Sequence, residues 1–285
     1  MRLESLNSVC IMRGPVFAGS FYPGAKFELE SFIDKAMAGA SIKAVAVKDA
    51  LAFVAPHAGY VYSGKTAAHT YKAASSGAAA SAESVVLIGP NHTGLGMPIA
   101  VSLEDWRTPL GTVRNDVALS KAIIAASGSI SADESAHSDE HSIEVQLPFV
   151  QRALPGKSAC MICMGDQSMG AASELAAAIE SASEKLHRRI IVLASSDFNH
   201  YEPASTAKEK DEKLISALER MDERAFYSAI LKTGDSACGF GPITVAMLFA
   251  KHAGAKKGLL LDYSNSGDTT HDSSSVVAYA SLAFV

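Results

Sequence analysis

Short apolar runs bounded by glycine, proline or serine alternate along the chain with segments of helical periodicity. Continuous apolar runs of this length are typical of strands that are covered on both faces. The predicted strands are residues 51–56, 84–90, 158–164, 189–196, 258–264 and 274–284. The predicted helices are residues 27–39, 116–126, 171–187, 207–221 and 243–253. This alternation predicts an α/β fold with a central, mostly parallel β-sheet flanked by helices.

Residues with catalytic or metal-binding side chains follow three of the predicted strands. His57 follows the first strand, Asn91 and His92 follow the second, and Asp197 and His200 follow the fourth. Functional sites in parallel sheets gather at the carboxyl ends of the strands. A single histidine in such a place is more often satisfied by a backbone carbonyl. Three of them in equivalent places favour one shared site at this edge of the sheet.

Cys238 lies just before a predicted helix start in the segment CGFGPI, residues 238–243. Pro242 suits the first turn of a helix, where its missing N–H is not needed. The positive end of the helix dipole favours the thiolate, which is the form that binds metals and attacks electrophiles. The alternative that stays open is a small buried residue in a glycine-rich turn.

The composition excludes several classes of protein. The 285 residues are 48% hydrophobic and 19% charged, with a net charge of −5 and no block of like charges, so neither nucleic acid nor a membrane surface is an expected partner. No apolar run approaches the roughly 20 residues that span a bilayer. Four cysteines are too few for a disulfide scaffold. We therefore expect a single-domain, reduced, cytoplasmic protein.

Eight ordered segments together resemble the Memo family, which is also component B of the AmmeMemoRadiSam set. They are RGPVFAGSFYPG (13–24), APHAGYVYSG (55–64), GPNHTG (89–94), TPLGTVRND (108–116), EHSIEVQLPF (140–149), SSDFNHY (195–201), CGFGPI (238–243) and YSNSGDTTHDSSSVVAYASLAF (263–284). The expected Memo-like α/β domain is residues 13–285. Residues 1–12 fall outside it as an N-terminal extension for which disorder is an expectation, and Met12 is an alternative start.

The resemblance implies a fold shared with the LigB-like class III extradiol dioxygenases, which are non-haem iron enzymes. Carried over by motif, it implies His57, His92 and Cys238 as metal ligands. It also implies His200 as an acid/base residue, and we expect a neighbour such as Asp197 to orient it. The expected cofactor is a divalent metal, with Fe(II) first. A thiolate in place of a carboxylate makes the site softer, so zinc or copper can compete.

The segment EHSIEVQLPF adds His141 and Glu144 as residues that line the pocket or hold its ligands, and Asn91 is a further pocket residue. The spelling HSDEH (137–141) matches a helical zinc-protease motif, but only its last two residues belong to the family segment. CMIC (160–163) matches a redox motif but lies in a predicted strand, where its cysteines face opposite sides.

Three functions remain open from the sequence. The first is a metal-dependent, dioxygenase-like oxidoreductase acting on a small oxygen-bearing substrate. The second is a non-catalytic metal-binding, redox or peptide-binding protein that uses the same pocket. The third is a hydrolase or transferase with Cys238 as nucleophile and His200 as base. The expected ligand is a small molecule or a peptide, and the resemblance implies association with a radical-SAM protein. The glycine-rich GPNHTGLG lacks a phosphate-loop lysine, so no nucleotide cofactor is expected.

Overall fold

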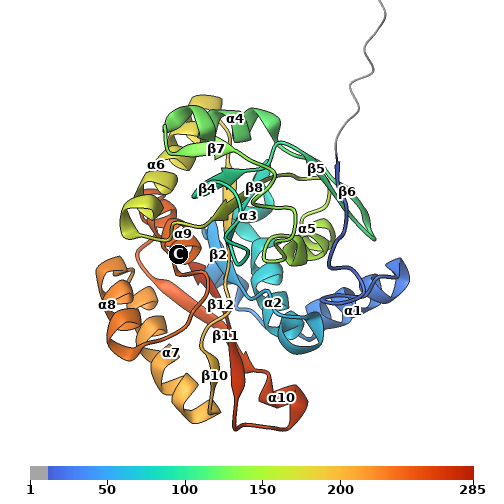
Figure 1. Cartoon of the computed structure of the whole chain (residues 1–285), viewed down its shortest axis with the longest axis vertical. Coiled ribbons are helices and arrows are strands. Elements are labelled where there is room, and N and C mark those ends of the chain that lie inside the picture. Colours follow the sequence, from blue (N-terminus) through green and yellow to red (C-terminus); the bar gives the residue numbers. More distant parts are fainter. Residues whose placement is uncertain (1–11) are drawn as a thin grey trace, which may run out of the picture.

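The computed structural model describes residues 12–285. Its large sheet has the strand order β10-β12-β2-β9-β3-β8-β4-β7, and β11 pairs with β12 (Figure 1). These strands are β2 (Ala52–Ala55), β3 (Ser84–Pro90), β4 (Ile99–Val101), β7 (Ile130–Ala132), β8 (Ser158–Met164), β9 (Ile190–Ser195), β10 (His200–Glu202), β11 (Gly258–Asn265) and β12 (Val276–Phe284). The central strands β2, β9, β3 and β8 are mutually parallel. Antiparallel pairs extend this core on both sides, through β12 next to β2 and β4 next to β8.

A second, small sheet joins β1 (Met12–Arg13), β5 (Asp105–Thr108) and β6 (Gly111–Val113). The helices of more than four residues are α1 (Lys26–Gly39), α2 (Tyr60–Ala74), α4 (Val117–Ala126), α5 (Leu147–Ala153), α6 (Met169–Leu186), α7 (Ala204–Glu219), α8 (Glu223–Thr233) and α9 (Phe240–His252). The four-residue helices are α3 (Gly77–Ala80) and α10 (Gly267–Thr270), and two 3₁₀ turns are η1 (Ala44–Val47) and η2 (Glu144–Gln146). Within residues 12–285, no helix is both long and apolar enough to cross a membrane.

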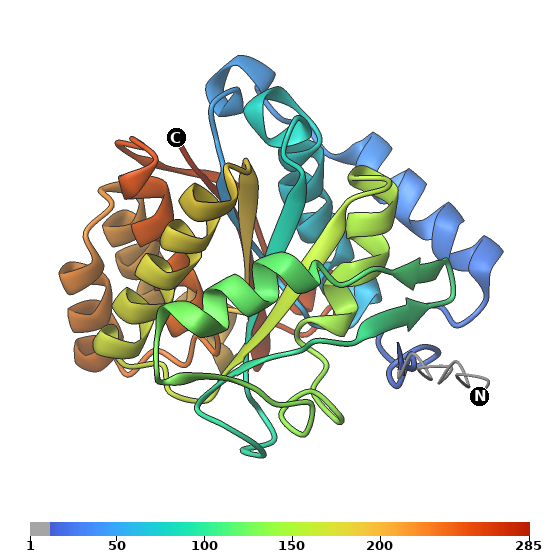
Figure 2. The same cartoon turned by 90° about the horizontal axis from the view of Figure 1, so that it is seen from above.

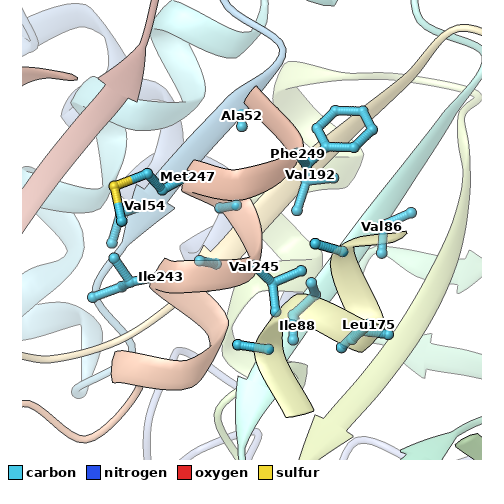
Figure 3. Close-up of a cluster of buried hydrophobic side chains, with 14 of the residues drawn as sticks. Ala52, Val54, Val86, Ile88, Leu175, Val192, Ile243, Val245, Met247 and Phe249 are labelled. Carbon is cyan, nitrogen blue, oxygen red and sulfur yellow. The ribbon is translucent and has the colours of Figure 1, made fainter. Parts of the chain in front are cut away.

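Helices cover both faces of the large sheet, with α1, α2 and α5 on one side and α6 and α9 on the other (Figure 2). Figure 3 shows one of the two cores, which contains Val54 and Ile88 of the sheet, Leu175 of α6 and Val245 of α9. Burial on both faces explains why these strands are continuous apolar runs. Each buried aliphatic side chain of this kind contributes roughly 1.5–3 kcal/mol relative to an exposed one.

The six predicted strands and five predicted helices are all present, with ends that shift by three residues or fewer. The prediction that the two cysteines of CMIC face opposite sides is confirmed, because Cys160 belongs to one core and Cys163 to the other. Helix α2 was missed, since serine, threonine, alanine and glycine are buried along much of it and blur the apolar period. Apart from Met12, the predicted extension at residues 1–12 lies outside the described residues.

Candidate functional site

A cavity of about 830 Å³ opens at the carboxyl ends of β2, β9 and β3. Its lining brings together residues from eight separate stretches of the chain: Phe21, His57, Ala58, Gly59, Tyr62, His92, His141, Asp197, His200, Tyr201, Ser236, Cys238, Ser266, Thr270, Val277 and Tyr279. The predicted ligands and acid/base residues all face this one cavity. The expected clustering at one edge of the sheet is therefore what the structure contains.

His57 lies two residues beyond the end of β2 and is almost fully buried. Its Nδ1 is 2.9 Å from the hydroxyl oxygen of Ser195, the last residue of β9. Ser195 donates its own hydroxyl hydrogen to the carbonyl of Ser142 at 2.7 Å. Nδ1 of His57 must therefore carry a hydrogen and donate it to Ser195. The lone pair of the neutral ring is then on Nε2, which faces the cavity.

Glu140 positions the two other imidazoles of the cavity. Its Oε1 lies 3.0 Å from Nδ1 of His92 and 3.4 Å from Nδ1 of His141. Burial opposes the charge on Glu140, but hydrogen bonds from His92 and from the backbone N–H of Ser142 outweigh it and lower the pKa of this carboxyl to about 2. The ionised carboxylate accepts from Nδ1–H of His92 and lies close to Nδ1 of His141, so the Nε2 atoms of both rings stay available for a ligand. Glu140 is not among the site residues predicted from the sequence, although it directly precedes His141.

The three imidazoles form a compact group whose ligand atoms all lie within 4.8 Å of one another. The ring centres of His57 are 5.2 Å from those of both His92 and His141. Burial lowers the pKa of His57 well below its usual value, and repulsion from the other imidazoles adds to this. Burial also lowers the pKa of His141 to about 4. Neutral imidazoles with oriented Nδ1–H groups are the form that binds a divalent metal, so these residues fit such an ion.

Cys238 lies next to this group, with Sγ 3.2 Å from Nε2 of His57. It is not itself a member of the compact group of three histidines. Helix α9 begins at Phe240, close enough for its dipole to act on the thiol. Burial nevertheless raises the pKa of the Cys238 thiol, and the Asp197 carboxyl raises it further. Burial therefore opposes the expected thiolate.

Asp197 does not orient His200 as expected. Its Oδ1 accepts hydrogen bonds from the backbone N–H of His57 at 2.8 Å and of Ala58 at 3.2 Å. Burial raises the pKa of Asp197 to about 7, against these bonds. His200 is instead held by the carbonyl of Ser236, 3.1 Å from its Nδ1. Burial lowers the pKa of His200, which favours the neutral ring, and the Ser236 contact at Nδ1 places the lone pair of that ring on Nε2.

Glu144 and Asn91 do not line the cavity. Glu144 is fully buried beneath the N-terminal segment, where it pairs with Arg13 and accepts from the hydroxyl of Tyr22 at 2.7 Å. Asn91 shapes the turn after β3, because its Oδ1 accepts from the backbone N–H groups of Thr93 and Gly94. Both residues therefore support the walls of the cavity rather than facing it.

The segment HSDEH (137–141) does not form the zinc-protease motif that its sequence matches. Residues 137–141 form turns and not a helix, so the two histidines do not share a helical face. His137 is buried against the indole of Trp106, with ring centres 5.5 Å apart. Only His141 reaches the cavity.

These observations define an α/β protein with a histidine-rich cavity at the carboxyl ends of its parallel strands. A family model described as "Memo-like protein" matches residues 13–283. A MEMO1 family protein of Methanosarcina acetivorans is 39% identical over 95% of this chain and 98% of its own length. MEMO1 family proteins of Nitrosopumilus maritimus and Archaeoglobus fulgidus are 40% and 41% identical, each over 96% of this chain and 100% and 99% of their own. The chain belongs to the Memo-like family.

Among solved structures, an uncharacterized protein of Escherichia coli K12 is similar over 70% of this chain and 86% of its own, with 14% identity and a TM-score of 0.46.

Proposed function

We propose that this protein binds a divalent metal through His57, His92 and Cys238, with His141 as a fourth donor, and uses it as an oxidoreductase on a small oxygen-bearing substrate. The observation that supports this most is the common orientation of the imidazoles. Each Nδ1 faces a protein oxygen, and the three rings lie around one point. Outer partners of this kind orient histidine ligands in metal sites.

Cys238 is compatible with the same ion. Its Sγ is 3.2 Å from Nε2 of His57, close to the separation expected for two donors on one metal, with metal–nitrogen bonds of about 2.0–2.1 Å and metal–sulfur bonds of about 2.3 Å. The backbone N–H of Asp197 donates to Sγ at 3.3 Å, which supports a thiolate there. Fe(II) is the metal expected from the family resemblance, and zinc and copper are the competing ions for a nitrogen and sulfur donor set.

A bound metal would supply Lewis acidity toward a coordinated oxygen. The protein's own contribution is then positional. His200 lines the same cavity and holds a free Nε2, so it can take a proton from the substrate. Phe21, Tyr62 and Tyr279 supply aromatic walls that suit a ring-bearing or otherwise flat substrate.

A cysteine hydrolase or transferase is the less supported alternative. The sequence paired Cys238 with His200 as base, whereas the contact is with His57. Since burial raises the pKa of the thiol, a metal-free nucleophile would exist mostly in its unreactive form. A non-catalytic metal-binding or redox role uses the same ligands and differs only in turnover. Association with a radical-SAM protein stays a prediction.

Metal analysis of anaerobically purified protein tests the proposal. We expect about one metal per chain in the parent and loss of the metal in His57→Ala combined with His92→Ala. His187→Asn is the matched control, because His187 caps α6 with a positive φ that asparagine tolerates and lies outside the cavity. Retained stoichiometric binding in the double variant would overturn the proposed site. Metal binding without turnover of any catechol or related oxygen-bearing compound would contradict the oxidoreductase role and support the non-catalytic one.

A further inference from the structure

A second cavity, of about 530 Å³, is lined by residues of α1, α2, β11 and α10. Figure 1 shows where these four elements lie in the fold. Tyr62 lines both this cavity and the histidine cavity. Around α10, Ser266 and Thr270 face the histidine cavity, whereas Asp268 and Thr269 face the second one. The two cavities are therefore neighbours, but no proposed metal ligand lines the second. Its function can be tested independently of the metal.

One wall of the second cavity is a chain of hydroxyls that ends on a carboxylate. Thr66 donates its hydroxyl hydrogen to Oδ2 of Asp262 at 2.8 Å, and its Oγ1 lies 2.6 Å from Oγ of Ser264. A threonine hydroxyl has a single hydrogen, so Ser264 must be the donor in the second contact. Ser264 therefore keeps its lone pairs for the cavity. Oδ1 of Asp262 has no hydrogen-bond partner within residues 12–285, although the side chain is only 33% exposed.

His69 borders the same wall. Its Nδ1 lies 3.1 Å from the carbonyl of Lys65 and 3.5 Å from Oδ2 of Asp262. Both neighbours are acceptors, so Nδ1 carries a hydrogen. The free positions of Asp262 and Ser264 are acceptors, and they lie beside the negative charge of the carboxylate. A primary ammonium group, with three donors and a positive charge, satisfies such a wall.

The rest of the lining indicates what is attached to the ammonium group. Phe32, Ala36 and Ala40 of the α1 segment give an apolar side to the cavity. Lys35 and Lys65 add two exposed positive charges at its edge, which favour a carboxylate on the same ligand and disfavour a simple amine. The volume lies within the roughly 300–1,000 Å³ typical of small-molecule sites.

We propose that this second cavity binds a free α-amino acid with an apolar side chain, its ammonium group on Asp262 and Ser264 and its carboxylate toward Lys35 and Lys65. The apolar side chain would lie against Phe32 and Ala36. Because Tyr62 lines both cavities, an occupant here would contact a residue of the histidine cavity without entering it.

Calorimetric titration of the full chain with L-phenylalanine tests this proposal, with N-acetyl-L-phenylalanine and 2-phenylethylamine as comparison ligands. We expect saturable binding of L-phenylalanine, weaker binding of the amine and none of the acetylated compound. Asp262→Asn, which keeps the acceptor for Thr66 but removes the charge, should weaken binding about tenfold or more. Ala36→Trp should fill the apolar side and abolish binding. Asp49→Asn, at an exposed carboxylate outside the cavity, should bind like the parent.

Three results would overturn the proposal. They are an absence of saturable L-phenylalanine binding by the parent protein, equal binding of the acetylated compound, and unchanged binding in Ala36→Trp. Thermal unfolding of each variant shows whether it folds, and Asp262→Asn and Ala36→Trp change residues of different elements, β11 and α1. Loss of metal from the histidine variants described above leaves these outcomes unaffected, since none of those residues lines the second cavity.

Discussion

Oγ of Ser195 lies 2.9 Å from Nδ1 of His57 and gives its own hydrogen to the carbonyl of Ser142. This arrangement determines which nitrogen of His57 faces the cavity, because a hydroxyl whose hydrogen is already engaged can only accept from the imidazole. Gln146 donates a further hydrogen bond to the same Oγ at 2.8 Å. A serine outside the cavity lining thus determines the tautomer of a proposed metal ligand.

Ser195→Ala should weaken metal binding by about 10–100-fold, the usual effect of removing an outer partner of a histidine ligand. The variant keeps every proposed ligand but loses the acceptor that orients His57. Competition titration with a chelator measures the affinity, and Ser129→Ala, at an exposed serine, is the control. Unchanged affinity in Ser195→Ala would show that the tautomer of His57 is not set by this contact.

Cys238→Ser should abolish the sulfur-to-metal charge-transfer absorption of copper(II)- or cobalt(II)-substituted protein, because oxygen replaces the only proposed sulfur ligand. His141→Ala should keep this absorption while weakening the affinity. The pair of variants separates a site of two histidines and a cysteine from one of three histidines. A parent protein that binds the metal without such absorption would exclude Cys238 from the ligand set.

The parent protein should lose stability as the pH rises from acid to mildly alkaline values, and Asp211→Asn should reduce this loss. Asp211 accepts from the hydroxyl of Tyr263 at 2.7 Å and from the backbone N–H of Asn199 at 3.1 Å. Burial, and then repulsion by Asp235, raises its pKa to about 8, above the value of about 4 in an unfolded chain. The folded state therefore holds an extra proton between these values, and its stability falls as pH rises through them.

Urea unfolding at pH 5 and pH 8 measures this effect, because an asparagine side chain resembles the protonated acid at both values. The difference in unfolding free energy between the parent and Asp211→Asn should change by more than about 1 kcal/mol from pH 5 to pH 8, in favour of the variant at pH 8. A difference that does not depend on pH would contradict the raised pKa.

Arg13→Met should lower the free energy of unfolding by about 3–5 kcal/mol, because it leaves the buried carboxylate of Glu144 without its cationic partner. The guanidinium also packs 4.1 Å from the ring centre of Trp106, which methionine replaces only in part. Arg152→Met is the matched control, since Arg152 pairs with Asp34 at the exposed surface, where such a pair contributes at most about 1 kcal/mol. An equal decrease in the free energy of unfolding in the two variants would contradict a larger contribution from the buried pair.

The sequence predicts the sheet and the edge at which the site lies because both depend on local patterns. Apolar runs identify the buried strands, and His57 and His92 follow them directly. Parallel pairing of β2, β9 and β3 then brings the strand ends together. This part of the site follows from strand order alone.

The roles of individual side chains depend on rotamers and long-range hydrogen bonds, which a single sequence does not contain. Asp197 precedes His200 by three residues, yet its carboxylate accepts a hydrogen bond from the backbone of His57, which follows the neighbouring strand β2. Glu144 lies in the same segment as His141 but on the buried side of the 3₁₀ turn, toward Arg13. Proximity in the sequence therefore predicted that Asp197 and Glu144 lie near the cavity, but it did not predict their hydrogen-bond partners.

The buried contacts of Glu144 carry a consequence for how the cavity assembles during synthesis. The backbone N–H of Phe17 reaches Glu144 across 127 residues of chain, and Phe21 of the same segment packs on the imidazole of His141 with ring centres 4.6 Å apart. A ribosome delivers the N-terminal loop long before its anchor exists. The Phe21 side of the cavity can therefore be anchored only after residue 144 has been made, and the later strands β9 and β12 complete the cavity after that.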